Sequence, residues 1–178
     1  ESGEWTDLQD RLTVEWLAQQ YGLLVKTSTV LEAVSVVASK YAFHPVREYL
    51  KNLTWDGTER LATWLNKALG VDISPYSEKV GKRWLIGAVA RVMRPGSKVD
   101  NVLILEGSQG AGKSTALSVL GDQWFMDTPF TLGDKEAFQM IRGKWIIELG
   151  ELDAFNKADS TKAKQFFSAS TDTFRESY

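Results

Sequence analysis

The sequence predicts an α/β protein in which a helical N-terminal domain (residues 1–97) is followed by a truncated core with a mainly parallel sheet (residues 98–178). Three observations lead to this prediction. Apolar residues recur at helical spacing through the first half, short apolar runs bounded by polar residues begin only after Val99, and a glycine-rich segment joins the first of these runs to a helix.

Local capping signals place the helices of the first half. Thr29 with Glu32 matches a capping box, as does Asp56 with Glu59, and Pro45 suits the first position of a helix. A longer amphipathic stretch ends before Pro95-Gly96. These signals predict helices that begin near residues 29, 45 and 56. Apolar residues at helical spacing predict a further helix from about residue 8 and a longer one over about 77–93.

The second half contains short apolar runs of the length of buried strands. VLILE (102–106) directly precedes the glycine-rich segment, and WIIEL (145–149) is a second run of this kind. A weaker candidate is 124–126, and helices are predicted over about 113–120 and 161–169. This order predicts an α/β core with only about three strands.

Composition excludes several classes of protein. The net charge of −2 is unlike that of a protein that coats DNA, although a few basic residues facing a channel would suffice for a motor. With no cysteine and one histidine, neither a thiolate zinc site nor a histidine-rich metal site is expected. No apolar stretch approaches the roughly 18 residues of a membrane span, and the start lacks a signal-peptide pattern. We therefore expect a cytoplasmic protein without a membrane partner.

The glycine-rich segment GSQGAGKS (107–114) matches the Walker A pattern G-x-x-x-x-G-K-S/T. Glycines let the backbone turn sharply and bring amide groups against phosphate oxygens, and the following helix N-terminus favours negative charge. Lys113 would reach the β- and γ-phosphates, and the Ser114 hydroxyl would ligate Mg²⁺. The expected ligands are ATP and Mg²⁺, held by Gly107, Ser108, Gln109, Gly110, Ala111, Gly112, Lys113, Ser114 and Thr115.

A P-loop NTPase also needs an acid at the end of a neighbouring strand. Glu148, inside the apolar run WIIEL, is the best candidate to hold the metal, because a carboxylate there is costly to bury without a cation or a donor. The alternative is a solvent-facing position on an edge strand. Glu151 could orient the attacking water, or it could be an ordinary loop acid, and Asp153 competes with it for that role.

Several landmarks resemble the virulence-associated E family of phage and mobile-element ATPases, which is similar to the superfamily-three helicases that accompany primases. The resemblance runs from about residue 43 to 178. Its most specific parts are Trp-Asp-Gly (55–57) and EGSQGAGKST (106–115). The remaining landmarks are HPVREYLKNLTWDGTERLATWL (44–65), RWLIGAVARVMRPGSKVDNVLILEGSQGAGKST (83–115), GKWIIELGEL (143–152) and KQFFSASTDTFRESY (164–178).

The resemblance implies a hexameric, ring-forming ATPase, a helicase that acts on single-stranded DNA during replication of a phage or mobile element. It makes Glu148 the Walker B acid and places Lys164 and Arg175 near the nucleotide or the DNA, although both could also be solvated surface charges. Superfamily-three members usually carry two adjacent acids where this chain has Leu149 after Glu148, so Glu151 is the candidate substitute. No later sensor strand or arginine finger is present, so we expect a fragment that binds ATP but hydrolyses it slowly.

Other readings of the same residues remain open. The chain could be an ATPase that remodels a protein partner without moving on DNA, or a non-catalytic nucleotide-binding module. Kinase activity is a further alternative, although no phosphoacceptor lid is recognisable. Trp55 is expected to pack as an anchor beside a turn. Arg83, Arg91 and Arg94 fall near one helix face and could be solvated, contact a neighbouring subunit or bind phosphate, with the subunit contact slightly favoured.

Overall fold

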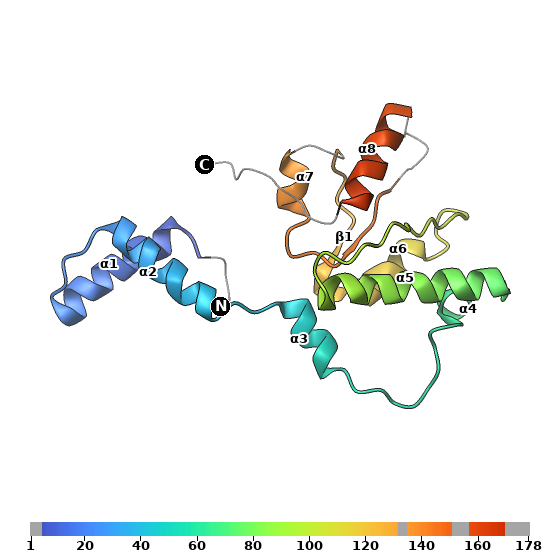
Figure 1. Ribbon diagram of the computed structural model, residues 1–178, viewed down its shortest axis with the longest axis horizontal. Coiled ribbons are helices and arrows are strands. Elements are labelled where there is room, and N and C mark those ends of the chain that lie inside the picture. The colour runs from blue at the N-terminus through green and yellow to red at the C-terminus, as the bar shows by residue number, and fades with distance from the viewer. Residues whose placement is uncertain (1–4, 132–134, 151–156, 170–178) are drawn as a thin grey trace. The chain divides into compact units, whose positions relative to one another are not determined.

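The computed structural model describes residues 5–131, 135–150 and 157–169. Contacts divide the chain into two compact units, Glu1–His44 and Pro45–Tyr178. The predicted domain boundary between residues 97 and 98 stays a prediction. Figure 1 shows the elements in chain order: α1 (Asp7–Tyr21), α2 (Thr27–Lys40), α3 (Pro45–Asn52), α4 (Trp64–Leu69), α5 (Pro75–Met93), α6 (Lys113–Gly121), the 3₁₀ turn η1 (Asp122–Trp124), β1 (Phe125–Met126), α7 (Lys135–Met140), β2 (Ile146–Ile147) and α8 (Lys157–Ser168).

The first unit is a pair of helices, α1 and α2. Thr6 caps α1 together with Gln9, and Gly22 ends it in the left-handed conformation, with φ of 66°. The predicted capping box at Thr29 is wrong. The residue with extended backbone before α2 is Lys26, so Thr29 already lies inside the first turn, where its hydroxyl does not cap.

In the second unit, α5 is the longest helix, and it packs against α3 and α4. Ser74 caps it by accepting a hydrogen bond from the Ser77 amide at 3.1 Å, and Pro75 occupies the first turn. The Arg47 guanidinium of α3 donates to the Val92 carbonyl at 3.0 Å. Five helices predicted in the first half are therefore confirmed, and α3 begins at Pro45 as predicted, although α2, α4 and α5 begin at other residues than predicted.

The turn before α4 differs from its prediction. Asp56 does not cap a helix, because α4 begins only after Thr63, and Trp55 is 73% exposed rather than a packed anchor. The Asp56 carboxylate instead pairs with Arg60, with an N–O distance of 2.7 Å, and accepts from the Thr58 amide at 3.0 Å. Asp56 thus stabilises an exposed turn, because its bonds stay within this short segment.

The hydrogen bonds from Arg60, and then that from the Thr58 amide, hold the pKa of Asp56 well below its usual range. The pair is therefore fully formed above the ordinary pKa of 3.8 and is lost as the pH falls through the lowered value. We expect Arg60→Gln to raise the pKa of Asp56 toward 3.8. A titration of the Asp56 carboxyl carbon by NMR measures this shift, and an unchanged pKa in the variant would contradict it.

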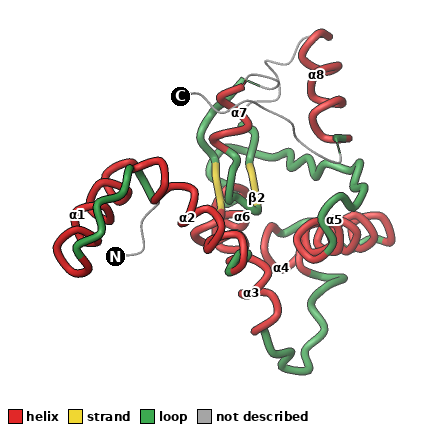
Figure 2. The backbone as a smooth tube through the Cα atoms, turned by 60° about the vertical axis from the view of Figure 1, so that its left-hand side comes forward, coloured by secondary structure: helices red, strands yellow, loops and turns green. Residues whose placement is uncertain are grey.

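The sheet consists of two short parallel strands, in which Phe125 pairs with Ile146 and Met126 with Ile147. Figure 2 shows the strands (yellow) side by side with α6 next to them. The ladder extends by the Glu148 amide, which donates to the Met126 carbonyl at 2.8 Å. The strands predicted at 124–126 and 145–149 are confirmed as this short pair, and their parallel direction agrees with the mainly parallel sheet that the sequence predicts.

The strand predicted at 102–106 is not formed. No ladder is present there among the described residues, and Val102 and Ile104 are 49% and 60% exposed. An apolar run favours burial, but a strand also needs a neighbour that satisfies its backbone groups. In the described part of the chain, no strand pairs with 102–106, so its backbone groups have no ladder partner.

The last turn of α6 approaches both strands closely. A Cβ placed on Gly121 would lie 2.9 Å from Phe125 Cβ and 3.0 Å from Ile146 Cβ. The helix after the glycine-rich segment, which the sequence predicts over about 113–120, is thereby fixed against the sheet. The sequence gives no sign of this close approach.

Replacing Gly121 with alanine should therefore lower the free energy of unfolding by about 1–3 kcal/mol, because the added methyl group overlaps both strands. Gly150→Ala is the matched control, since a Cβ there meets nothing within 4 Å. Urea unfolding of both variants measures the difference. Equal stability of the two variants would show that α6 does not pack this tightly on the strands.

Aromatic side chains join α7 and α8. Phe166 of α8 lies between Phe138 of α7 and Phe130, with ring centroids 5.6 Å and 6.3 Å away. α8 confirms the predicted C-terminal helix, and α7 has no counterpart in the predictions. No helix in the described ranges has the length and apolar character that a membrane crossing needs.

Candidate functional site

The segment 107–112 forms a tight loop that leads directly into α6. Gly110 and Gly112 have φ of 81° and 79°, in the left-handed region that side chains other than glycine rarely adopt. A Cβ on either would meet nothing within 4 Å, so the backbone conformation, rather than space, requires glycine. The Ala111 amide donates to the Ser108 carbonyl at 3.3 Å and closes the turn. The loop therefore has an open side from which a ligand could approach.

The start of α6 has the properties of an anion site. The first amide with a backbone acceptor is that of Ala116, which donates to the Gly112 carbonyl at 2.9 Å. The amides of Lys113, Ser114 and Thr115 thus have no backbone partner among the described residues, as in the first turn of any helix. With the helix dipole, such amides favour a bound anion.

Lys113 brings a positive charge to the same loop. Its Nζ donates to the carbonyl oxygens of Gly107 and Ser108, both at 2.9 Å. The ammonium is thus held across the loop, six residues from one acceptor and five from the other. An incoming phosphate would find this cation and the free amides of α6 together.

Ser114 and Glu148 meet although 34 residues separate them in sequence, because the Ser114 hydroxyl donates to Glu148 Oε1 at 2.7 Å. Glu148 directly follows β2, so its carboxylate lies at the carboxyl end of the parallel strands. Its second oxygen, Oε2, is buried without a hydrogen-bond partner among the described residues. An unpartnered buried carboxylate oxygen is costly, so this position favours a cation or a donor.

These groups fit a magnesium ion held together with a phosphate. A hydroxyl and a carboxylate are the hard oxygen ligands that Mg²⁺ prefers, and Mg²⁺ usually takes few protein ligands besides substrate phosphates. Within the described ranges, no group of three or more His, Cys, Asp or Glu side chains could hold a metal without such help. The Ser114–Glu148 pair therefore suits a metal that arrives with a nucleotide.

The remaining predicted site residues divide into two groups. Gln109 is exposed within the loop, Thr115 is exposed in the first turn of α6, and Lys164 is exposed on α8. Glu151 and Arg175, like the competing Asp153, lie outside the described residues. Their predicted roles are untested.

Arg91 has a role that sequence reasoning missed. Its Nη2 donates to the carbonyls of Val99 and Phe167, both at 3.0 Å. It therefore ties α5 to the segment that precedes the loop and to the last turn of α8. This role differs from the three considered for it, and no sequence signal could have found it, because its acceptors are backbone carbonyls.

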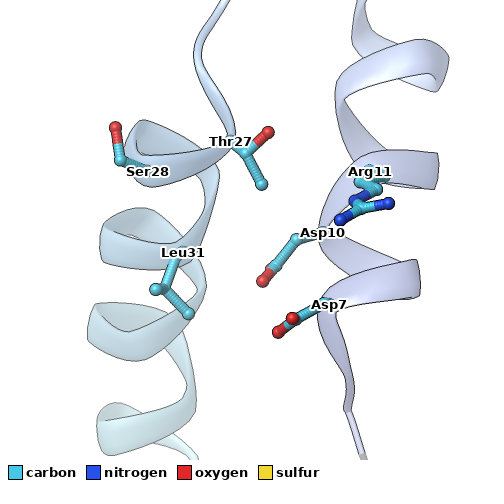
Figure 3. A pocket seen from close by; sticks show the side chains of 6 residues that line it. All are labelled: Asp7, Asp10, Arg11, Thr27, Ser28 and Leu31. Carbon is cyan, nitrogen blue, oxygen red and sulfur yellow. The ribbon is translucent and has the colours of Figure 1, made fainter. Parts of the chain in front are cut away.

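A cavity of about 320 Å³ lies within the first unit. Figure 3 shows Asp7 and Asp10 extending from α1 toward α2, where Thr27 and Leu31 line the other side. Asp10 is 4% exposed, and its Oδ1 accepts a hydrogen bond from Trp5 Nε1 at 2.7 Å. Trp5 thus supplies the hydrogen-bond donor that the buried Asp10 carboxylate needs, and this hydrogen bond joins the segment before α1 to that helix.

Comparison with protein families gives a match to this chain. The sequence model of the virulence-associated protein E-like domain matches residues 50–178, more than half of the chain. The matched range includes the glycine-rich loop, Ser114 and Glu148. A search of the curated proteins found no match.

Proposed function

This chain belongs to the virulence-associated protein E-like family, and on that premise we propose that it binds and hydrolyses ATP as the P-loop domain of a helicase-like replication protein from a phage or mobile element. The observation that carries the proposal is the hydrogen bond of 2.7 Å between Ser114 and Glu148. It joins the Walker A serine to the acid at the end of a parallel strand. In P-loop NTPases these two positions hold the magnesium ion.

The groups of the site have distinct roles in this proposal. The free amides at the start of α6 bind phosphate oxygens, and Lys113 exchanges its contacts with Gly107 and Ser108 for the β- and γ-phosphates. Ser114 and Glu148 hold the metal. When bound, Mg²⁺ neutralises the charge that develops on the transferred phosphoryl group.

The reaction is attack of water on the γ-phosphate. The loop amides and Lys113 stabilise the negative charge of the transition state, because they are positioned before the reaction begins. Glu151 is the proposed group that orients the water. It lies outside the described residues, so its role rests on its position just after the run 145–149.

The proposed partners follow from the family resemblance. We propose single-stranded DNA as the polymer on which the protein acts, a hexameric ring as its assembly, and adenine as the preferred base. ATP hydrolysis would then drive movement along DNA or unwinding of a duplex.

The decisive experiment measures ATP turnover by the purified protein with and without Mg²⁺, and with and without single-stranded DNA. We expect turnover that requires Mg²⁺ and rises when DNA is added. Turnover that ignores DNA would favour an ATPase that remodels a protein partner. Tight nucleotide binding without turnover would favour a non-catalytic binding module and would overturn the proposed hydrolysis.

A further inference from the structure

One face of α5 is buried and the opposite face is open. Ser77, Gly81, Gly87 and Val92 are buried, and the helix contacts α3 and α4. At 100° per residue, these positions lie on the side opposite Lys79, Lys82 and Ile86. Which face of α5 is exposed therefore follows from the contacts of this helix with α3 and α4, and not from the sequence pattern alone.

The first half of the open face is basic. Lys79, Lys82 and Arg83 are all exposed, and none forms an ion pair with another described residue. Glu78 is the one acid between residues 75 and 94, and it is half-buried and makes no ion pair with them. Like charges one helical turn apart destabilise a helix when nothing neutralises them. Three unpaired cations in a chain with a net charge of −2 thus mark a local site for an anion.

An aromatic side chain extends the same row. Tyr76 is 78% exposed, three residues before Lys79 and seven before Arg83, so the three lie along one stripe of the helix. Basic side chains interleaved with an exposed aromatic ring are the combination by which proteins hold single-stranded nucleic acid. The cations meet the phosphates, and the ring stacks on a base, which is accessible only when that base is unpaired.

We propose that the face of α5 formed by Tyr76, Lys79, Lys82 and Arg83 binds the backbone of a single-stranded nucleic acid. The choice of nucleic acid as the polyanion rests on the proposed function, but binding by this face requires no ATP. The face also differs from the contact at Lys164 that the family resemblance implies. The protein would then bind the nucleic acid at a site separate from the phosphate loop.

The test measures binding of a fluorescent oligothymidylate by fluorescence anisotropy, without ATP, at several salt concentrations. Each phosphate contact on a single strand contributes about 0.7 to the slope of log K against log salt. The variant Lys79→Ala/Lys82→Ala/Arg83→Ala should lower the slope by about 2 and weaken binding about 100-fold at 0.1 M salt. Alanine favours helix, so α5 should stay folded, which circular dichroism checks.

The matched control is Lys26→Ala/Lys40→Ala/Lys51→Ala, which removes the same charge from exposed lysines outside α5. It should keep the wild-type slope. Tyr76→Ala should weaken binding roughly tenfold with the slope unchanged, and Tyr76→Phe should bind like wild type, because stacking needs the ring and not the hydroxyl.

Several outcomes would overturn the proposal. One is an equal loss of affinity in the control triple variant and in the α5 triple variant, because the weaker binding would then result from the change in net charge. Another is wild-type binding by the α5 triple while Lys164→Ala loses affinity. A third is an α5 triple that binds DNA normally but changes its oligomeric state, which would assign the face to a protein contact that continues over Ile86, Val89 and Met93. ATP turnover of the wild-type protein is measured separately. A result against nucleic-acid binding by this face can therefore be distinguished from a result against the proposed ATPase activity.

Discussion

Replacing Lys113 with alanine is expected to lower kcat for ATP hydrolysis at least about 100-fold, the scale seen when one donor to a developing negative charge is removed. Among the described residues, the Lys113 ammonium is the side-chain charge that is hydrogen-bonded to the loop, through the carbonyls of Gly107 and Ser108. Its removal leaves the loop amides in place but takes away the group that we propose reaches the β- and γ-phosphates. Steady-state turnover with saturating Mg²⁺ measures the effect.

Lys144→Ala is the control for this variant. Lys144 is exposed, and it lies just before β2 rather than at the loop. Loss of one surface charge there should leave turnover unchanged. Equal activity of Lys113→Ala and wild type would contradict the assignment of the loop as the phosphate site, even though the family membership would stand.

Replacing Glu148 with glutamine separates metal binding from nucleotide binding. The amide oxygen of glutamine can still accept the hydrogen bond from Ser114, so the local geometry of 2.7 Å is largely preserved. The negative charge is lost, however, and with it the ligand that Mg²⁺ prefers. We expect turnover to fall about 100-fold or more, while the affinity for nucleotide in the absence of Mg²⁺ stays close to that of wild type.

Binding of a fluorescent nucleotide with and without Mg²⁺, measured beside turnover, checks this expectation. Glu106→Gln is the matched control, because Glu106 is an exposed acid directly before the loop and, among the described residues, forms no hydrogen bond or ion pair with Ser114 or Lys113. If Glu148→Gln retained full turnover that depends on Mg²⁺, another group would hold the metal. Loss of nucleotide binding without Mg²⁺ would show instead that Glu148 maintains the shape of the loop.

Elements with strong local signals were predicted well. Pro45 begins α3 and Gly112 precedes α6, because proline presets the backbone for a first helical turn and glycine tolerates the left-handed conformation. Capping residues were less reliable. Asp56 has the side chain of a cap but pairs with Arg60, because a carboxylate binds whichever donor the backbone brings nearest.

The run 102–106 shows where local reasoning fails. Its apolar residues predict burial, yet Ile104 is 60% exposed. The hydrophobicity of a segment indicates that its side chains favour burial. A strand, however, forms only beside another strand whose backbone groups are free to pair with it. β1 and β2 satisfy this condition for each other, and both were found from short apolar runs of the same kind.

For the candidate site, the amino-acid sequence was sufficient to locate the candidate phosphate loop, because that loop is contiguous and its glycines, Lys113 and Ser114 lie within a few residues of one another. The sequence also named Glu148, as an acid in an apolar run. Three features needed the folded chain: the contact of Ser114 with Glu148 across 34 residues, the approach of Gly121 to both strands, and the open basic face of α5. Each depends on which elements pack together, and packing is set by long-range burial and strand pairing that no local pattern encodes.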